Sequence, residues 1–247
     1  MNHIDYEILI QKIDKSKSMS RRNVVCIAYH DEDEKLPFVI KKTNSQEYIF
    51  LEKLKDIIQV PKLYYHNEDT FCCEYIHGIT LFDWLNSDDY TLNKFRNILF
   101  NIIKTLIKIQ KTYKFFRHGD LYTVNIILLD MDPVFIDFEM SSFHDKTIHE
   151  LYDLYCLFYF LRDKDEVLND FIYHIFPPDK YFTQLKYMTS KKFFLSDIKH
   201  ENLPTLKEVL AHPFFLDCNK YGKACESRSY CQQCQDQCSE ERGRRRS

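Results

Sequence analysis

The sequence predicts an α+β fold with two lobes, in which a small strand-rich lobe with one helix is followed by a larger helical lobe. Short apolar and β-branched runs separated by turn residues dominate the first ninety residues, which is typical of strands. From about Leu92 onward, apolar residues recur at helical spacing instead. With 247 residues, 45% of them hydrophobic, the chain can bury a substantial core.

Four strands and one helix are expected in the first lobe. The strands cover residues 24–29, 36–41, 62–66 and 70–76. The helix is expected over residues 45–58, with Ser45 as its N-cap and Pro61 shortly after its end. Its apolar residues recur at helical spacing, at Phe50, Leu51, Leu54, Ile57 and Ile58.

The second lobe begins with a long amphipathic helix. Its apolar stripe consists of Phe95, Ile98, Leu99, Ile102, Ile103, Leu106 and Ile109. A loop at 118–125 and two short strands at 126–129 and 134–136 follow, and then several helices. The expected organisation is therefore an N-lobe over residues 1–76, a C-lobe over 77–216 and a Cys-rich, basic tail over 217–247.

The charge balance indicates no polyanionic partner for the chain as a whole. Its 34 Lys and Arg residues stand against 37 Asp and Glu residues, a net charge of −3. Nucleic acid binding is not expected, except through the Arg-rich end of the tail. No membrane-spanning segment and no signal peptide are expected, so the predicted location is cytoplasmic or nuclear.

The nine cysteines fall into two groups. Four lie within apolar segments and are expected to be buried: Cys26, Cys72, Cys73 and Cys156. Five crowd into the last thirty residues: Cys218, Cys225, Cys231, Cys234 and Cys238. Zn²⁺ bound by Cys225, Cys231, Cys234 and Cys238 is one interpretation, because Cys231 and Cys234 have the spacing of a zinc knuckle. A disulfide cluster and a tail of reduced thiols are the alternatives.

Two short segments carry the residues best suited to chemistry, HGDLYTVN at 118–125 and IDFE at 136–139. Asn125 and Asp137 supply hard oxygen ligands for Mg²⁺, which neutralises the charge of a transferred phosphoryl group. Asp120 is placed to accept the proton of an attacking hydroxyl. An expected hairpin between Asn125 and Asp137 brings the two metal ligands face to face. The arrangement predicts phosphoryl transfer.

This order of residues resembles the protein-kinase-like superfamily over roughly residues 6–216. The resemblance implies a bilobal protein-kinase-like fold that binds ATP and Mg²⁺, with Asp120, Lys41 and Asn125 as catalytic residues and Asn125 and Asp137 as metal ligands. Lys41 ends the sequence FVIK, which matches the strand whose lysine holds the ATP phosphates, and Glu47 would orient it. Two alternatives stay open, since Lys42 is adjacent to Lys41 and Glu52 lies on another face of the same helix.

The segment CEYI at 73–76 resembles the hinge that binds adenine in this superfamily. The resemblance implies that the backbone of Glu74 and Ile76 would hydrogen-bond adenine, with Cys73 as the gatekeeper. Val39 would form the roof of the adenine site and Ile127 its floor. The sequence LAHPFF at 210–215 resembles the closing helix of protein kinases.

Several departures from the superfamily pattern narrow the type of kinase. No glycine stands at 14–22, where a Gly-rich loop normally covers the phosphates. Glu139 replaces the glycine of Asp-Phe-Gly, as in choline and aminoglycoside kinases, and the segment after Asp137 is short. His118 is followed by Gly119 and not by Arg, so no switch through activation-loop phosphorylation is expected. These features resemble the atypical kinases of the KEOPS-complex and RIO types, of which the KEOPS type fits best, and a viral or parasite source is expected from the composition.

Asp153 lies in a strongly apolar segment at 151–161. A buried carboxylate without partners is costly. Kinase-like folds place an Asp here to accept hydrogen bonds from backbone amides of the catalytic loop, and the alternative is a simple helix-start Asp.

The leading hypothesis is an ATP- and Mg²⁺-dependent atypical protein kinase that phosphorylates Ser or Thr hydroxyls of a protein substrate or partner. The first alternative is a small-molecule kinase of the choline or aminoglycoside type, favoured by Glu139 and the short segment after Asp137. The second is a pseudokinase scaffold, favoured by the missing glycine loop. A scaffold has no need for Lys41, Asp120, Asn125 and Asp137 together, which favours an enzyme.

Overall fold

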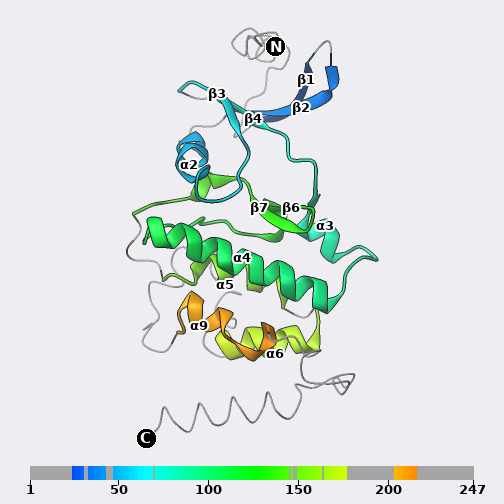
Figure 1. Cartoon of the computed structure of the whole chain (residues 1–247), viewed down its shortest axis with the longest axis vertical. Coiled ribbons are helices and arrows are strands. Elements are labelled where there is room, and N and C mark those ends of the chain that lie inside the picture. The colour runs from blue at the N-terminus through cyan, green and yellow to red at the C-terminus, as the bar shows by residue number, and fades with distance from the viewer. Residues whose placement is uncertain are drawn as a thin grey trace, which may run out of the picture.

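The computed structural model describes residues 24–30, 33–42, 47–68, 70–144, 146, 149–162, 164–176 and 203–215. Three sequence predictions lie outside these residues: the phosphate-covering segment at 14–22, the Ser45 cap, and the Cys-rich tail with its possible zinc ligands. In Figure 1 a four-stranded sheet and one helix lie above a strand hairpin, below which the remaining helices are stacked. The predicted α+β, bilobal kinase-like fold class is confirmed.

The upper sheet is antiparallel throughout, in the order β1-β2-β4-β3. Its strands are β1 (Val24–His30), β2 (Asp33–Lys42), β3 (Leu63–His66) and β4 (Thr70–Glu74). The central strand β4 is buried from Thr70 to Cys73, which fits a strand with neighbours on both sides. Cys72, Cys73 and, in the lower lobe, Cys156 are buried, as predicted, whereas the side chain of Cys26 lies outside the described part of the structure.

Helix α2 (Glu47–Leu54) is shorter than the apolar pattern predicted. After Leu54 the chain tightens, since the Ile57 N–H donates to the Leu54 carbonyl three residues back. Ile58 is nevertheless buried. The apolar periodicity therefore marks residues that reach the core, but it does not mark where the helix ends.

A second sheet lies between the upper sheet and the helices, with strand order β5-β6-β7 (Figure 1). It consists of β5 (Ile79–Thr80), β6 (Ile126–Leu129) and β7 (Asp132–Phe135). Asp130 and Met131 join β6 to β7 with φ values of 51° and 71°. Positive φ at both central residues is the mark of the two-residue turn that matches the twist of a hairpin. The short strand β5 was not predicted.

The larger lobe is built around a buried helix, α5 (Tyr152–Leu161). Every residue of α5 from Tyr152 to Phe158 is buried, as expected for a helix that is apolar all round. The helices around it are α3 (Leu81–Leu85), α4 (Leu92–Thr112), α6 (Glu166–Ile175) and α9 (Leu206–Leu210). The predicted apolar stripe of α4 is fully buried. No helix in the described part of the chain is both long and apolar enough to span a bilayer.

Candidate active site

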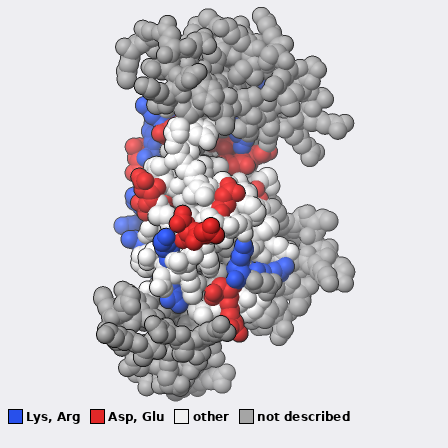
Figure 2. All heavy atoms as spheres, turned by 90° about the vertical axis from the view of Figure 1, so that its right-hand side faces the viewer, with Lys and Arg blue, Asp and Glu red and all other residues white. Residues whose placement is uncertain are grey.

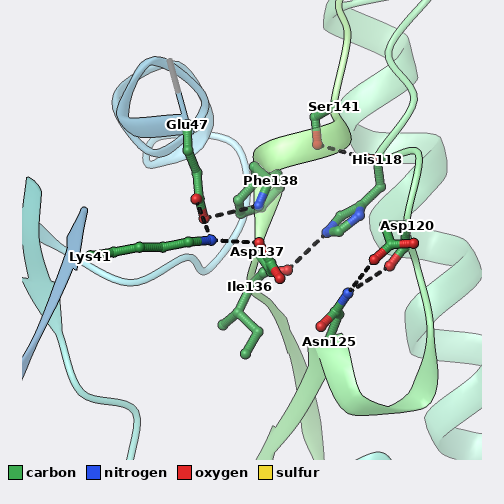
Figure 3. A network of polar contacts seen from close by, with 9 residues as sticks. All are labelled: Lys41, Glu47, His118, Asp120, Asn125, Ile136, Asp137, Phe138 and Ser141. Atoms are coloured by element: carbon green, nitrogen blue, oxygen red, sulfur yellow. Dashed lines mark hydrogen bonds and ion pairs between the residues drawn. The ribbon is translucent and has the colours of Figure 1, made fainter. Parts of the chain in front are cut away.

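Lys41 occupies the centre of the site, at the end of β2. Its Nζ lies 2.6 Å from Glu47 Oε2 on α2 and 2.6 Å from Asp137 Oδ1, which follows β7 (Figure 3). The Lys41 side chain is nearly buried. Burial alone would lower the pKa of Lys41, but the charge of Glu47 and the hydrogen bond to Asp137 outweigh it, and the pKa is raised. Lys41 is therefore a cation at neutral pH.

The contacts of Lys41 decide between the two pairs of candidates left open by the sequence. Lys42 is exposed, whereas Lys41 faces inward, because successive side chains of a strand point to opposite faces. Glu52 is also exposed and contacts Lys55 at 2.9 Å on its own helix. Glu47 is buried and accepts a hydrogen bond from the Phe138 N–H at 3.0 Å in addition to its contact with Lys41. The structure thus pairs Lys41 with Glu47.

Asp137 owes its position to an unusual backbone conformation. Its φ of 62° and ψ of 66° lie in the left-handed region, which Asp tolerates better than most residues. The next three residues, Phe138–Met140, form a 3₁₀ turn, η2. Glu139 is not one of the described residues that have a positive φ. The position that is Gly in Asp-Phe-Gly therefore needs no glycine here.

Asp120 and Asn125 both belong to the segment 118–125, here called the catalytic loop, and they contact each other. Asn125 Nδ2 donates to the Asp120 carbonyl at 2.8 Å and to Asp120 Oδ2 at 3.2 Å. This leaves Asn125 Oδ1 turned away from Asp120 (Figure 3). The Ile136 N–H donates to the Asn125 carbonyl at 3.1 Å, so the β6–β7 hairpin carries Asn125 and Asp137 at the same end. Figure 3 shows Asp137 between Lys41 and the Asp120–Asn125 pair.

The oxygen donors at this end of the hairpin fit a magnesium ion. Mg²⁺ is usually held by one or two protein oxygens together with water and phosphate. Asn125 Oδ1 and the second carboxylate oxygen of Asp137 are of that kind. In the described part of the chain, no group of three or more His, Cys, Asp and Glu side chains is arranged to hold a metal, so a site built wholly from such ligands is not found there.

The catalytic loop is held from below by Asp153 on α5. Asp153 Oδ2 accepts from the His118 N–H and Oδ1 from the Gly119 N–H, both at 2.9 Å. Asp153 is fully buried. The predicted role of Asp153, as an acceptor for backbone amides of this loop, is confirmed.

His118 joins the same loop to the segment that leads to Asp137. Its Nε2 lies 3.0 Å from the Ile136 carbonyl, and because a carbonyl can only accept, Nε2 carries the proton. Burial lowers the pKa of His118, so the ring is neutral at pH 7. The His118 carbonyl accepts from Ser141 Oγ at 2.8 Å. Ser141 was not predicted as a site residue, since a lone serine carries no signal.

Two glycines of the site permit close backbone approach, which the sequence analysis missed. Gly119 has a φ of 82°, and a Cβ there would collide with the Met140 carbonyl. A Cβ on Gly78 would collide with the Leu128 carbonyl and would lie 2.6 Å from Ile127 Cγ2. The chain has only four glycines, and two of them lie here. The scarcity of glycine in the chain could therefore have marked Gly78 and Gly119 from the sequence as positions where a side chain does not fit.

The residues expected around adenine lie on β2 and β4 of the upper sheet, on β6 of the second sheet and on the segment after β4. Val39 on β2 pairs in register with Cys73 on β4, and Ile127 pairs with Thr80. The Glu74 N–H donates to the Lys62 carbonyl at 2.8 Å, and the Ile76 carbonyl accepts from the Gly78 N–H at 3.0 Å. These two contacts leave the Glu74 carbonyl and the Ile76 N–H as the main-chain groups to consider for adenine.

Aromatic rings connect α2 to the catalytic loop. Phe50 of α2 stacks on Phe143, with ring centroids 4.5 Å apart, and lies parallel to Phe138 at 6.1 Å. Phe138 in turn contacts the His118 ring at 4.9 Å. The helix that supplies Glu47 is thus packed onto the segment that supplies Asp137.

Charge is mixed on the one face of the molecule that Figure 2 shows. Figure 2 shows acidic side chains gathered across the middle of the face that looks to the right in Figure 1, with basic side chains around them. No continuous basic surface is visible among the described residues of that face.

The fold and the arrangement of Lys41, Glu47, Asp120, Asn125 and Asp137 define a protein-kinase-like protein. A model of the RIO domain matches residues 7–171, which is more than half of the chain. The chain belongs to the RIO domain family, a family of atypical protein kinases that use ATP. The expected likeness to atypical kinases is confirmed, with a match to the RIO type, whereas the sequence analysis favoured the KEOPS type. The viral or parasite source stays a prediction.

One solved structure that matches is the crystal structure of the Rad53 kinase domain and SCD2 in complex with AMPPNP. It is 17% identical, with a TM-score of 0.48, and the match covers 86% of this chain and 94% of the other. No curated protein matches the chain.

Proposed function

We propose that the chain is an ATP- and Mg²⁺-dependent atypical protein kinase that transfers the γ-phosphoryl group of ATP to Ser or Thr hydroxyls. The observation that carries the proposal is the convergence of five side chains from separate segments. Lys41, Glu47 and Asp137 meet within 2.6 Å contacts, and Asp120 and Asn125 meet beside them. Membership of the RIO domain family supports the same activity.

Nucleotide binding would involve residues of both lobes. Adenine would lie between Val39 and Ile127, with hydrogen bonds to the Glu74 carbonyl and the Ile76 N–H. The Lys41 ammonium group, oriented by Glu47, would hold the phosphates. Since Lys41 is a buried cation, its attraction for phosphate oxygens is weakly screened by solvent.

Asn125 and Asp137 would hold Mg²⁺, which, when bound, neutralises the charge on the phosphate oxygens. Asp120 would accept the proton of the acceptor hydroxyl through its carboxylate, which the Asn125 amide orients. The hydroxyl oxygen forms a bond to the γ-phosphorus while the bond between that phosphorus and the β–γ bridging oxygen breaks. The products are a phosphoester and ADP, and the proton is left on Asp120.

The direct test is transfer of label from ATP. Purified protein with labelled ATP and Mg²⁺ should label a generic protein or itself, and Asp120→Ala should abolish labelling while nucleotide binding persists. If ATP, with or without Mg²⁺, does not raise the melting temperature of the wild-type chain, every enzymatic interpretation is wrong and a scaffold remains. Transfer only to a small alcohol would favour a small-molecule kinase, the alternative indicated by Glu139 and the short segment after Asp137.

A further inference from the structure

An exposed valine stands inside the catalytic loop. The 3₁₀ turn η1 (Thr123–Asn125) buries Thr123 and Asn125, whereas the side chain of Val124 between them is 49% exposed. A three-residue turn places successive side chains in different directions, and this turn points an apolar one outward. Val124 is four residues after Asp120 and directly precedes Asn125.

An exposed phenylalanine lies beside the same loop. Helix α5 is buried from Tyr152 to Phe158, but Phe160 in its last turn is 50% exposed. Its ring meets the Tyr122 ring edge-on, with centroids 4.5 Å apart. Phe160 thus presents apolar surface next to the catalytic loop.

Tyr122 joins the two exposed side chains to the proposed base. It lies two residues from both Asp120 and Val124, and its backbone N–H donates to the Asp120 carbonyl at 2.8 Å. Burial raises the pKa of Tyr122, so the side chain is uncharged. Three uncharged side chains, here called the apolar shelf, therefore lie at this loop: Tyr122 and Val124, which belong to it, and Phe160, whose ring contacts Tyr122.

We propose that the apolar shelf binds a large apolar side chain of the protein substrate, next to the Ser or Thr that is phosphorylated. The inference rests on the proposed function, because it is the acceptor hydroxyl at Asp120 that brings the substrate over the shelf. Any molecule that places a hydroxyl on Asp120 must cover the surface around Asp120, and Val124 belongs to the same loop.

The chemistry of the shelf favours a leucine-like neighbour over a charged one. A Leu side chain gains by removing both its own surface and that of Val124 and Phe160 from water. A Lys or Arg side chain gains less at Val124, because covering that apolar surface removes water from its charge without supplying a partner. Among proteins with a Ser or Thr to be phosphorylated, the shelf therefore favours those with a large apolar side chain beside that residue.

The experiment measures phosphorylation of Ser peptides in which Leu replaces Ala at each position from three before to three after the Ser. We expect one position at which Leu raises kcat/KM about tenfold, mainly through a lower KM for peptide. Val124→Glu should remove that preference and create a preference for Arg at the same position. Phe160→Ser should weaken the Leu preference while the KM for ATP stays unchanged.

Tyr64→Ser is the matched control, because Tyr64 is 40% exposed on β3 of the upper sheet and has no place in the proposed machinery. It should retain the Leu preference and the activity. Melting temperatures of all variants verify that each is folded.

The outcomes separate the two proposals. If the wild-type chain phosphorylates Ser peptides with no position favouring Leu, or if Val124→Glu leaves the preference intact, the shelf proposal is wrong and the proposed function stands. If ATP stabilises the chain but no peptide is phosphorylated, the proposed function is wrong and the shelf proposal fails with it.

Discussion

The two sides of the candidate site are held by different forces. On the side of the larger lobe, buried hydrogen bonds fix the catalytic loop: two backbone amides donate to Asp153, and the His118 ring donates to the Ile136 carbonyl. On the side of the upper sheet, Lys41 is held by two ion pairs, with Glu47 and with Asp137. The loop is therefore set before any ligand binds, whereas the position of Lys41 depends on a carboxylate that is also a proposed metal ligand.

This difference implies that the two sides respond differently to ligand and to substitution. Buried hydrogen bonds that all lie within one lobe resist change, because each unpaired group would remain buried. Ion pairs between β2, α2 and the segment after β7 exchange partners more easily, since phosphate can replace Asp137 as the partner of Lys41.

The largest effect should follow from a change that leaves both sides intact. Asp120→Asn keeps the size of the side chain but removes the proposed base, so phosphoryl transfer should fall about 10²- to 10⁴-fold. The ATP-dependent rise in melting temperature should be unchanged. Rate and thermal shift are measured on the same preparation, and a variant with near-normal rate would show that Asp120 is not the base.

A smaller effect, on stability and not on rate, is expected when Asp153, which holds the catalytic loop, is replaced. Asp153→Asn leaves one acceptor oxygen for two buried N–H groups, so the free energy of unfolding should fall by about 3 kcal/mol. Urea unfolding measures this loss. A loss below about 0.5 kcal/mol would mean that the loop does not depend on Asp153 and that the comparison between the two sides is wrong.

Breaking the Lys41–Glu47 ion pair should lower the free energy of unfolding less than Asp153→Asn does. Glu47→Gln should lower the free energy of unfolding by about 1–2 kcal/mol, less than is typical of a broken buried pair, because Asp137 still contacts Lys41. It should also weaken ATP binding. Glu52→Gln is the matched control on the same helix and should change neither, since Glu52 is exposed and contacts only Lys55 among the ion pairs described. Equal effects of the two variants would contradict the assignment of Glu47.

The smallest expected effect is a pH dependence of stability that arises from His118 in the catalytic loop. Because burial lowers the pKa of His118 in the folded chain, the unfolded chain binds a proton first as the pH falls below about 6.5. Stability should therefore decrease from pH 7 toward pH 5.5. Urea unfolding of His118→Asn should show a shallower decrease than the wild-type chain, and an identical slope would show that His118 does not contribute.

The order of the site residues along the chain was predictable from the resemblance of its motifs to the protein-kinase-like superfamily. That resemblance implies the cation, the base and the two metal ligands that phosphoryl transfer needs. The choice of Lys41 over Lys42 was not, since it depends on which face of β2 turns inward, and that is set by the pairing of β2 with β4. The same holds for Glu47 and Glu52, which differ in burial and hardly in local sequence.

Other features depended on contacts between distant segments. Strand β5 has two residues and exists through its pairing with β6, so no periodicity could indicate it. The collision that forbids a side chain at Gly119 is with the carbonyl of Met140, twenty-one residues later. Asp153, by contrast, was correctly interpreted, because a carboxylate in an entirely apolar helix needs buried donors.

The central claim is that Asp137 and Asn125 form a magnesium site that acts together with ATP. Its most direct test is the melting temperature of the wild-type chain and of Asp137→Asn with ATP, in the presence of Mg²⁺ or of EDTA. Without ligand the variant should melt below the wild-type chain, because Lys41 loses one of its two ion pairs. Mg²⁺ should add to the stabilisation by ATP in the wild-type chain but not in the variant. An equal gain from Mg²⁺ in both proteins would contradict the account.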